Sequence, residues 1–371
     1  LKRTVYPGRF SPNTSISYIC VGISFLFLSL QSKSLLKYKY FFSATLASIT
    51  VSLAVGTLFG YVSGIVSDSV WSFTLGMALH TALFFVVIGA YLFTFSLPEK
   101  GKTPLWLPIP VFVLVLGITI SFWKGTEDYQ RQEIQSLVDA EARYAGNLTE
   151  KYLTDLYKAL DRMDHRWEME HGTPKNQWEA DSKAYLEAYA VLRALVITDT
   201  SSVVKWRTTL KDIPAASSKA IDEESRRKAA IERAIQSRTP QMTDLIEFPQ
   251  GGMGYLYLNP LYIGPKYDGL LIGSFDINDL FNDLLTQGGI LTNFWVNIYE
   301  KDVLIYTNNG HLDVYPYKLT ATETVEVAGK SWRFELNPKR PFIAAHRSNL
   351  PQIILIIGGL VAMMTGLMTY F

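Results

Sequence analysis

Almost every charged residue of this 371-residue chain lies within one interval, residues 124–347. Outside it there are eight Lys and Arg residues and only two acidic ones, Asp68 and Glu99. Long apolar runs without acidic or basic residues are typical of transmembrane helices, because the hydrocarbon core excludes unpaired charge. Such runs lie at residues 16–30, 42–62, 77–97, 105–123 and from 350 onward. We therefore predict a four-span membrane α-helical bundle at 1–123, a polar domain at 124–349, and a final transmembrane helix at 350–371.

The basic residues of the linkers predict the orientation of the spans. The linkers 31–39 and 98–103 contain lysines, whereas the linker between the second and third spans contains Asp68 and no basic residue. Short loops rich in Lys and Arg usually face the cytoplasm. We therefore expect both lysine-bearing linkers on the cytoplasmic side of the membrane and residues 124–347 outside. The basic residues before the first span oppose this scheme, because they would also lie outside. A further span upstream would place them in a short outer loop, which the rule penalises without forbidding.

An internal repeat favours a further upstream span. Residues 11–22 resemble residues 78–89, and Gly22 matches Gly89. A span precedes the second copy, so we expect one before the first copy as well, which gives two repeated membrane hairpins. The chain begins at Leu1 without Met and ends inside an apolar run, so we expect a fragment of a longer protein.

A proline-free segment, residues 126–170, follows the fourth span directly. Its apolar residues recur at helical spacing, which predicts one long helix with a single apolar stripe. At 1.5 Å per residue this helix would be roughly 65 Å long, and it would carry movement of the polar domain to the membrane. The membrane-proximal part of the stripe, at Ile134, Leu137 and Ala145, offers a surface for a second copy, so we expect a parallel homodimer.

One stretch, residues 251–285, organises the polar domain. Its tyrosines alternate with leucines, which is the period-2 pattern of a half-buried strand. Pro260 and Gly264 are expected to break this strand, and residues 270–275 to form the next one. Asp276 is then a natural N-cap for a short helix with one apolar face.

Shorter patterns complete the polar domain. They predict helices at 177–190 and 221–237, and strands at 195–199, 203–207, 242–248, 294–299, 303–307, 322–327 and 331–336. Antiparallel strands with helices crossing one face make an α+β domain. The number of strands predicts two linked sheets, one at about 177–287 and distal to the membrane, the other at about 288–340 and proximal to it.

These elements and several scattered motifs resemble the CHASE domain, a double-PAS-like sensory module found outside the membrane in histidine kinases and cyclases. The matching motifs are Leu160-Asp161-Arg162-Met163 with Trp167, Trp178-x-x-Asp181-x-x-x-Tyr185, Ile197-Thr198-Asp199 with Trp206, Leu258-Asn259-Pro260-Leu261-Tyr262, and residues 269–276 with Leu280. The resemblance implies that the distal part of the domain receives a small molecule, and it does not identify that molecule.

No catalytic or cofactor-binding motif stands out in the sequence. The five histidines lack the spacing of metal ligands, and the single cysteine, Cys20, lies in an apolar run. The glycine-rich segment 251–254 lacks the Lys and Ser/Thr of a phosphate-binding loop. The overall charge is close to neutral, so nothing predicts a nucleic-acid partner. We expect no metal, no cofactor and no catalytic residues within this chain.

A pocket for a small molecule is the stronger prediction, because aromatic walls with a few polar groups suit small ligands. The candidate residues lie on predicted strands of the distal sheet, and they are Trp206, Arg207, Tyr255, Tyr257, Asn259, Tyr262 and Phe275. For each aromatic residue, an ordinary position in the hydrophobic core explains the pattern as well as a position lining a pocket does. Tyr255 and Tyr257 should share one face of their strand, and Trp206 should approach that face from the neighbouring strand.

Three functions stay open. The favoured one is the input half of a sensor histidine kinase, with an output domain after Phe371 that acts on a response regulator. Its closest alternative is the input half of a diguanylate cyclase or phosphodiesterase that works through a cyclic dinucleotide. The chain is otherwise a non-enzymatic membrane binding protein, or a transporter or transporter accessory with an external domain. Against a transporter, the spans hold almost no charged residues that would mark a pathway.

Overall fold

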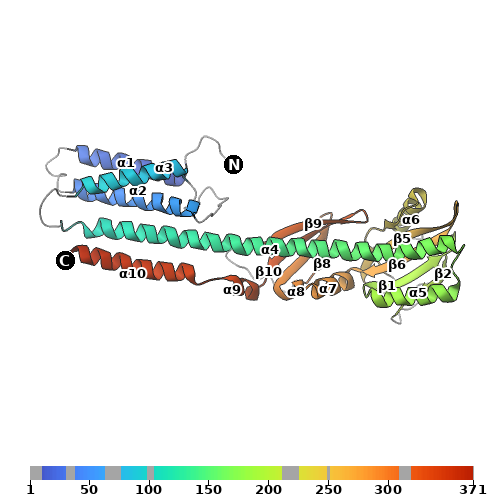
Figure 1. Cartoon of the computed structure of the whole chain (residues 1–371). Coiled ribbons are helices and arrows are strands. Elements are labelled where there is room, and N and C mark those ends of the chain that lie inside the picture. Colours follow the sequence, from blue (N-terminus) through green and yellow to red (C-terminus); the bar gives the residue numbers. More distant parts are fainter. Residues whose placement is uncertain are drawn as a thin grey trace. The chain divides into compact units, whose positions relative to one another are not determined.

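The computed structural model describes residues 11–30, 38–62, 77–97, 104–210, 225–248, 251–308 and 319–370. The chain divides into two compact units, one formed by Leu1–Ile134 with Arg347–Phe371 and the other by Gln135–His346. The first unit holds the apolar helices and the second holds both sheets (Figure 1). Most of the lysine-bearing linkers and the start of the predicted helix 221–237 lie outside the described residues.

The first unit is helical. Its helices are α1 (Pro12–Ser29), α2 (Lys39–Val62), α3 (Leu79–Phe95), the start of α4 (Pro108–Met169), and α10 (Leu350–Tyr370). All except α3 are long and apolar enough to cross a membrane, and α3 is apolar but shorter.

Small residues bring α2 and α4 together. A Cβ atom added at Gly56 would lie 2.5 Å from the Ser121 side chain, and one added at Gly117 would lie 2.5 Å from Ser52. The Ser52 hydroxyl donates to the Leu114 carbonyl oxygen at 3.0 Å. Close approach through small residues is the usual way in which apolar helices pack in a membrane.

The helix α4 is continuous from Pro108 to Met169, as the proline-free segment predicts. Its prolines are confined to the first turn, where the missing N–H groups have no helical partner in any case. Farther along, Gly146 lets α4 lie close to β9 (Ala321–Val327), because an added Cβ there would come within 3.0 Å of Glu323 and Val325. In the second unit α4 passes first the four-stranded sheet and then the six-stranded one (Figure 1).

Two antiparallel sheets form the second unit. The six-stranded sheet has the order β2 (Val204–Thr208), β1 (Leu192–Thr198), β6 (Lys266–Asp276), β5 (Met253–Ile263), β3 (Gln241–Met242), with β4 (Ile246–Glu247) also pairing with β5. The four-stranded sheet has the order β8 (Val303–Thr307), β7 (Phe294–Glu300), β10 (Lys330–Pro338), β9 (Ala321–Val327). The remaining helices are α5 (Lys175–Ala188), α6 (Ser225–Ser237), α7 (Ile277–Gln287), α8 (Ile290–Asn293) and α9 (Arg340–His346).

The strand β5 differs from its prediction in two ways. It continues through Pro260, which pairs opposite Leu270 of β6. On the other side of β5, the strand β3 begins at Gln241, opposite Leu258. Among the described residues, no strand therefore lies opposite Pro260 on that side and needs the N–H that proline lacks. The strand is also buried on both faces rather than one, from Gly254 to Leu261.

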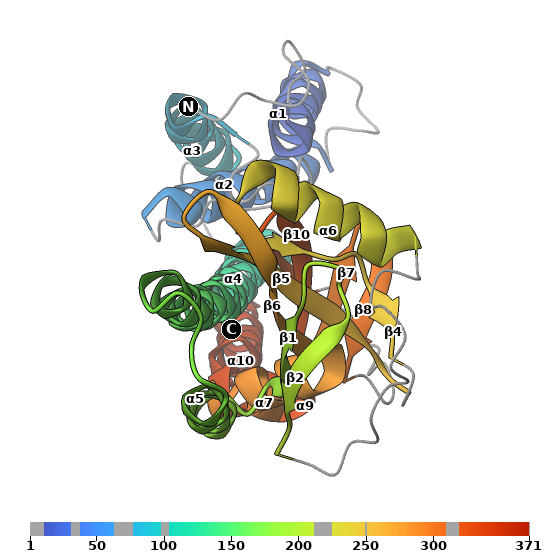
Figure 2. The same ribbon diagram turned by 90° about the vertical axis from the view of Figure 1, so that its right-hand side faces the viewer.

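Helices cover both faces of the six-stranded sheet, whereas one covered face was predicted. On one face, Leu256 and Leu258 pack with Ala230, Ile231 and Ala234 of α6. On the other face the sheet meets α4. Figure 2 shows α4 and α6 on opposite sides of β5 and β6.

The helix α7 joins the two sheets, and its predicted start is confirmed. Asp276 caps it by accepting hydrogen bonds from the backbone N–H groups of Asn278 and Asp279, at 2.9 and 3.2 Å. Its apolar face is buried, and Phe281 packs edge-on against Trp332 and Phe334 of β10, with ring centroids 5.5 and 5.8 Å apart. The helix α7 therefore packs in the core of the four-stranded sheet, whereas its N-cap, Asp276, is the last residue of β6 in the six-stranded sheet.

Candidate ligand-binding sites

Four predicted site residues lie on the face of the six-stranded sheet that α4 covers. Tyr255, Tyr257, Asn259 and Phe275 are all buried there. The Tyr257 hydroxyl donates to Asp161 Oδ1 of α4 at 3.2 Å, and Asn259 Nδ2 donates to the same oxygen at 3.4 Å. Burial, followed by the Asp161 charge, raises the pKa of Tyr257, so its phenol stays neutral. This face is a packed contact between α4 and the sheet.

Trp206 shares that face but lies far from the tyrosines. It is on β2, and β1 and β6 separate it from β5, so the predicted approach from a neighbouring strand is wrong. Its ring instead packs against Trp167 and Trp178, with centroids 5.8 and 5.7 Å away. Trp206 thus belongs to an aromatic cluster at the end of α4.

The two remaining predicted residues lie on the opposite face, towards α6. Arg207 pairs opposite Val196, which packs against the α6 core cluster. The Tyr262 hydroxyl donates to the Ile235 carbonyl oxygen of α6 at 2.9 Å. The structure therefore does not bring the seven predicted residues into one pocket, because side chains on alternate strand positions point to opposite faces.

Tyr267 on β6 was not predicted as a site residue. It packs against the same α6 core cluster, and its buried hydroxyl has no hydrogen-bond partner within the described part of the chain. Burial raises its pKa to about 12, so the hydroxyl keeps its proton. A buried donor without a partner is costly and calls for an explanation. Tyr267 was not predicted because the sequence pattern indicates a turn at this position, before the strand at 270–275.

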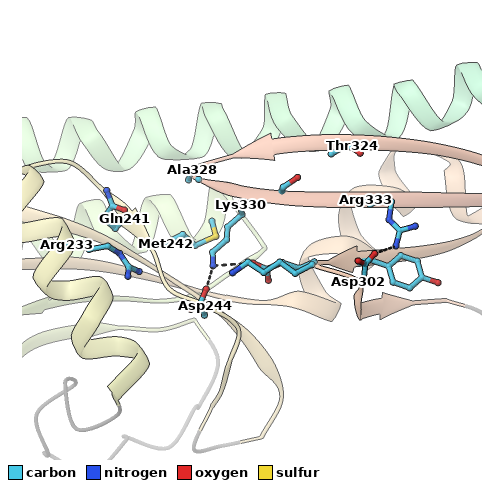
Figure 3. Close-up of a pocket in the computed structure, with 14 residues that line it drawn as sticks. Arg233, Gln241, Met242, Asp244, Asp302, Thr324, Ala328, Lys330 and Arg333 are labelled. Atoms are coloured by element: carbon cyan, nitrogen blue, oxygen red, sulfur yellow. Dashed lines mark hydrogen bonds and ion pairs between the residues drawn. The ribbon is translucent and has the colours of Figure 1, made fainter.

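A cavity of about 630 Å³ lies where the two sheets meet (Figure 3). Arg233 of α6 and Asp244 line it from the side of the six-stranded sheet. From the four-stranded sheet come Glu300 and Lys301 at the β7 turn, with Lys330 and Arg333 of β10. Charged groups from both sheets therefore face one space.

Lys330 is the centre of an ionic network in this cavity, in which Lys330 and Glu300 are buried and the Asp244 side chain is 55% exposed. The Lys330 side chain is 9% exposed, and its Nζ lies 2.6 Å from Asp244 Oδ1 and 3.2 Å from Glu300 Oε1. Glu300 also accepts a hydrogen bond from the Tyr255 hydroxyl, at 2.6 Å between the oxygens. The hydrogen bond from Lys330 lowers the pKa of Asp244. One lysine thus joins a carboxylate of each sheet.

The sequence does contain a signal for Lys330. Lys330, Trp332, Phe334 and Leu336 alternate along β10, and all four are buried. A lysine in the buried phase of a strand is rare unless it has a partner. Neither partner is adjacent in sequence, so only the fold reveals the network. Among the described residues there is no group of three or more His, Cys, Asp or Glu able to hold a metal ion.

Residues 219–307 match the family model described as the CHASE domain. The match covers α6 and the strands from β3 to β8, and it confirms the resemblance over that part of the chain. A comparison with curated proteins finds no match.

Several solved structures are similar to part of this chain at low identity. An extracellular ligand-binding receptor from Desulfohalobium retbaense aligns with 53% of this chain and 40% of its own, at 14% identity and a TM-score of 0.42. The ligand-binding domain of the Pseudomonas aeruginosa amino acid chemoreceptor PctB, in complex with L-Arg, aligns over 58% and 100%, at 13% identity and 0.41. That of the Campylobacter jejuni chemoreceptor Tlp3, in complex with L-valine, aligns over 58% and 98%, at 10% identity and 0.38. At these scores no conclusion about this chain rests on them.

Proposed function

We propose that this chain is the input module of a membrane-anchored signal receptor. The observation that carries the proposal is α4, a single helix that starts as an apolar span and ends against the sheet of a domain containing a CHASE match. A ligand that shifts the six-stranded sheet would also move α4, and α4 continues into the apolar unit. The domain is double-PAS-like in this proposal, with one sheet in each half.

The ligand site is proposed on the α6 face of the six-stranded sheet. Arg207 and Tyr262 from the predicted set lie there, and Tyr267 adds a buried hydroxyl with no partner among the described residues. A ligand that inserts between α6 and the sheet would satisfy this hydroxyl. On the other face Tyr257, Asn259 and Phe275 then transmit the change to α4, and Tyr255 transmits it to Glu300 of the four-stranded sheet. Trp206 packs against Trp167 near the end of α4.

The second unit lies outside the membrane in this proposal, as the lysine-bearing linkers predict. The output is a histidine kinase acting on a response regulator, with a diguanylate cyclase or phosphodiesterase as the alternative. Two positions in a Cys20→Ser background test the orientation, Tyr38→Cys and Glu187→Cys, both exposed. An impermeant thiol reagent should label position 187 and not position 38 in intact cells. The reverse pattern would refute the orientation.

Ligand binding is tested by thermal unfolding of the detergent-solubilised chain against a panel of small metabolites. A ligand present at a hundred times its dissociation constant stabilises a protein by about 2.7 kcal/mol. Tyr267→Phe removes the hydroxyl without a partner, so the free protein should keep its stability while the ligand-induced shift falls. Tyr306→Phe, in the other half of the domain, is the matched control and should leave the shift unchanged. A shift that survives both Tyr267→Phe and Arg207→Ala would rule out this face.

A further inference from the structure

We propose that the cavity between the two sheets is a second binding site, which takes a small anion carrying a carboxylate or phosphate group. This goes beyond the proposed function, because the cavity lies apart from the α6 face of the six-stranded sheet and either site can exist without the other. The cavity volume of about 630 Å³ falls within the usual range for small-molecule sites.

The charges in the cavity leave cations in excess around Asp244. Lys330 is bound by Asp244 and Glu300. Arg233 and Lys301 also line the cavity, and neither side chain has an ion-pair or hydrogen-bond partner within the described part of the chain. The charges of both act on Asp244 and help to lower its pKa. Three cations therefore surround two carboxylates, and one more anionic group would balance them.

The other end of the cavity is already neutral. Arg333 pairs with Asp302 at 2.8 Å and lies over the Tyr299 ring, with its guanidinium carbon 4.7 Å from the ring centroid. Figure 3 shows this pair at one end of the cavity, Arg233 and Asp244 at the other, and Lys330 between them. The anion is therefore expected at the Arg233 end.

Tight turns hold Lys301 and Lys330 in place. Lys301 and Asp302 form the two-residue turn between β7 and β8, and both have positive φ, at 48° and 65°. Ala328 and Gly329 form the corresponding turn between β9 and β10, at 49° and 76°. Turns of this kind match the twist of the paired strands and fix their register. A non-glycine residue at positive φ is costly, so Lys301 is presented by a backbone with little freedom.

Binding here would act on the link between the sheets. An anion beside Lys330 competes with Asp244 for the same ammonium group, and Asp244 is the partner contributed by the six-stranded sheet. Removing the charge of Asp244 should therefore strengthen anion binding, whereas removing Arg233 and Lys301 should weaken it. These opposite signs follow from the charges of the cavity, and a cation outside the cavity is needed to separate a built site from a general attraction to positive charge.

The experiment is titration calorimetry of the detergent-solubilised chain with inorganic phosphate and, separately, with succinate, each at constant ionic strength set with chloride. The wild type should bind at least one of the two anions saturably, and which one it prefers identifies the chemistry. Arg233→Gln/Lys301→Gln should weaken that binding by more than about tenfold, because losing one charge-assisted hydrogen bond alone has an effect of about that size. Asp244→Asn should strengthen it several-fold. Lys228→Gln removes one positive charge from an exposed position on α6 that does not line the cavity, and it is the control for general surface attraction.

Two results would overturn the proposal. One is the absence of saturable binding of either anion to the wild type. The other is an equal loss of affinity in Lys228→Gln and in the double variant, which would mean general surface attraction. Weaker binding in Asp244→Asn would overturn the competition with Lys330. None of these outcomes bears on ligand binding at Tyr267, so the two proposals fail separately.

Discussion

The Tyr157 ring of α4 lies parallel to the Tyr257 ring of β5, with centroids 4.3 Å apart and an interplanar angle of 5°. Tyr157 also packs edge-on against Phe275 of β6, at 6.4 Å. One aromatic side chain of the helix therefore contacts both central strands of the six-stranded sheet. Such pairs contribute about 0.5–1.5 kcal/mol beyond the area that they bury.

Tyr257→Ala should destabilise the chain by about 3–5 kcal/mol, as aromatic truncations in a core do. Urea unfolding of the detergent-solubilised chain, followed by tryptophan fluorescence, measures the loss. Tyr257→Phe keeps the stacked ring and removes only the hydrogen bond to Asp161, so it should cost about 1 kcal/mol. A loss of less than 1 kcal/mol in Tyr257→Ala would mean that α4 is not packed here.

Lys330→Met should be strongly destabilising, because it leaves the Glu300 charge buried with Tyr255 as its remaining side-chain donor among the described residues. Breaking a buried ion pair from one side typically costs about 3–5 kcal/mol. Adding Glu300→Gln should recover much of that loss, since the residual charge is then gone. A double-mutant cycle on unfolding free energies measures the coupling. Simple additivity would contradict the network.

Asp164→Asn should change how stability depends on pH. Burial, followed by the charges of Asp161 and Glu168, raises the pKa of Asp164 from 3.8 to about 6, although His165 opposes the shift. The folded state therefore holds this proton more tightly than the unfolded state, and stability falls as the pH rises from about 4 to 6. The variant should have a higher melting temperature than the wild type at pH 7.5 and a similar one at pH 4. The same difference at both values would exclude Asp164 as the cause.

Gly269→Ala should prevent correct pairing of β6 with β1. Gly269 has φ +143°, and an added Cβ atom would lie 2.2 Å from the Thr198 carbonyl oxygen. Gly264 is the matched control, because it has φ +60° and open space around it, so Gly264→Ala should cost only about 1–2 kcal/mol of left-handed strain. The comparison is made by circular dichroism and thermal unfolding. Equal stabilities in the two variants would contradict the close approach.

The expected parallel dimer has to use a different side of α4 from the predicted stripe. Ile134 and Ala145 are buried within the single chain, and Leu137 is half-buried. The exposed side carries Ala140 and Tyr144. In a Cys20→Ser background, Ala140→Cys should form an intermolecular disulfide and Ala145→Cys should not. No crosslink at position 140, with a monomer on sedimentation in mild detergent, would argue against the dimer.

Local patterns in the sequence predicted most of the elements of this protein, but not the passage of β5 through Pro260 or the short helices α8 and α9. Charge-free runs predict the apolar helices, and the absence of proline after the first turn of α4 predicts its continuity. Both features depend only on the residues within the segment itself and not on what the segment contacts. The cap at Asp276 follows for the same reason, since its acceptor and donors are at most three residues apart. The two antiparallel sheets follow from strand number and spacing.

Only the tertiary structure decided what those elements contact. Period-2 alternation placed Tyr255 and Tyr257 on one face of β5, but nothing local states that α4 covers that face and α6 the other. Strand order likewise set Trp206 apart from the tyrosines, since the chain crosses between strands that are not consecutive. The Lys330 network joins residues 30 to 86 positions apart. Pairings at such separations are selected by burial and charge compensation in the assembled core, which a local pattern does not encode.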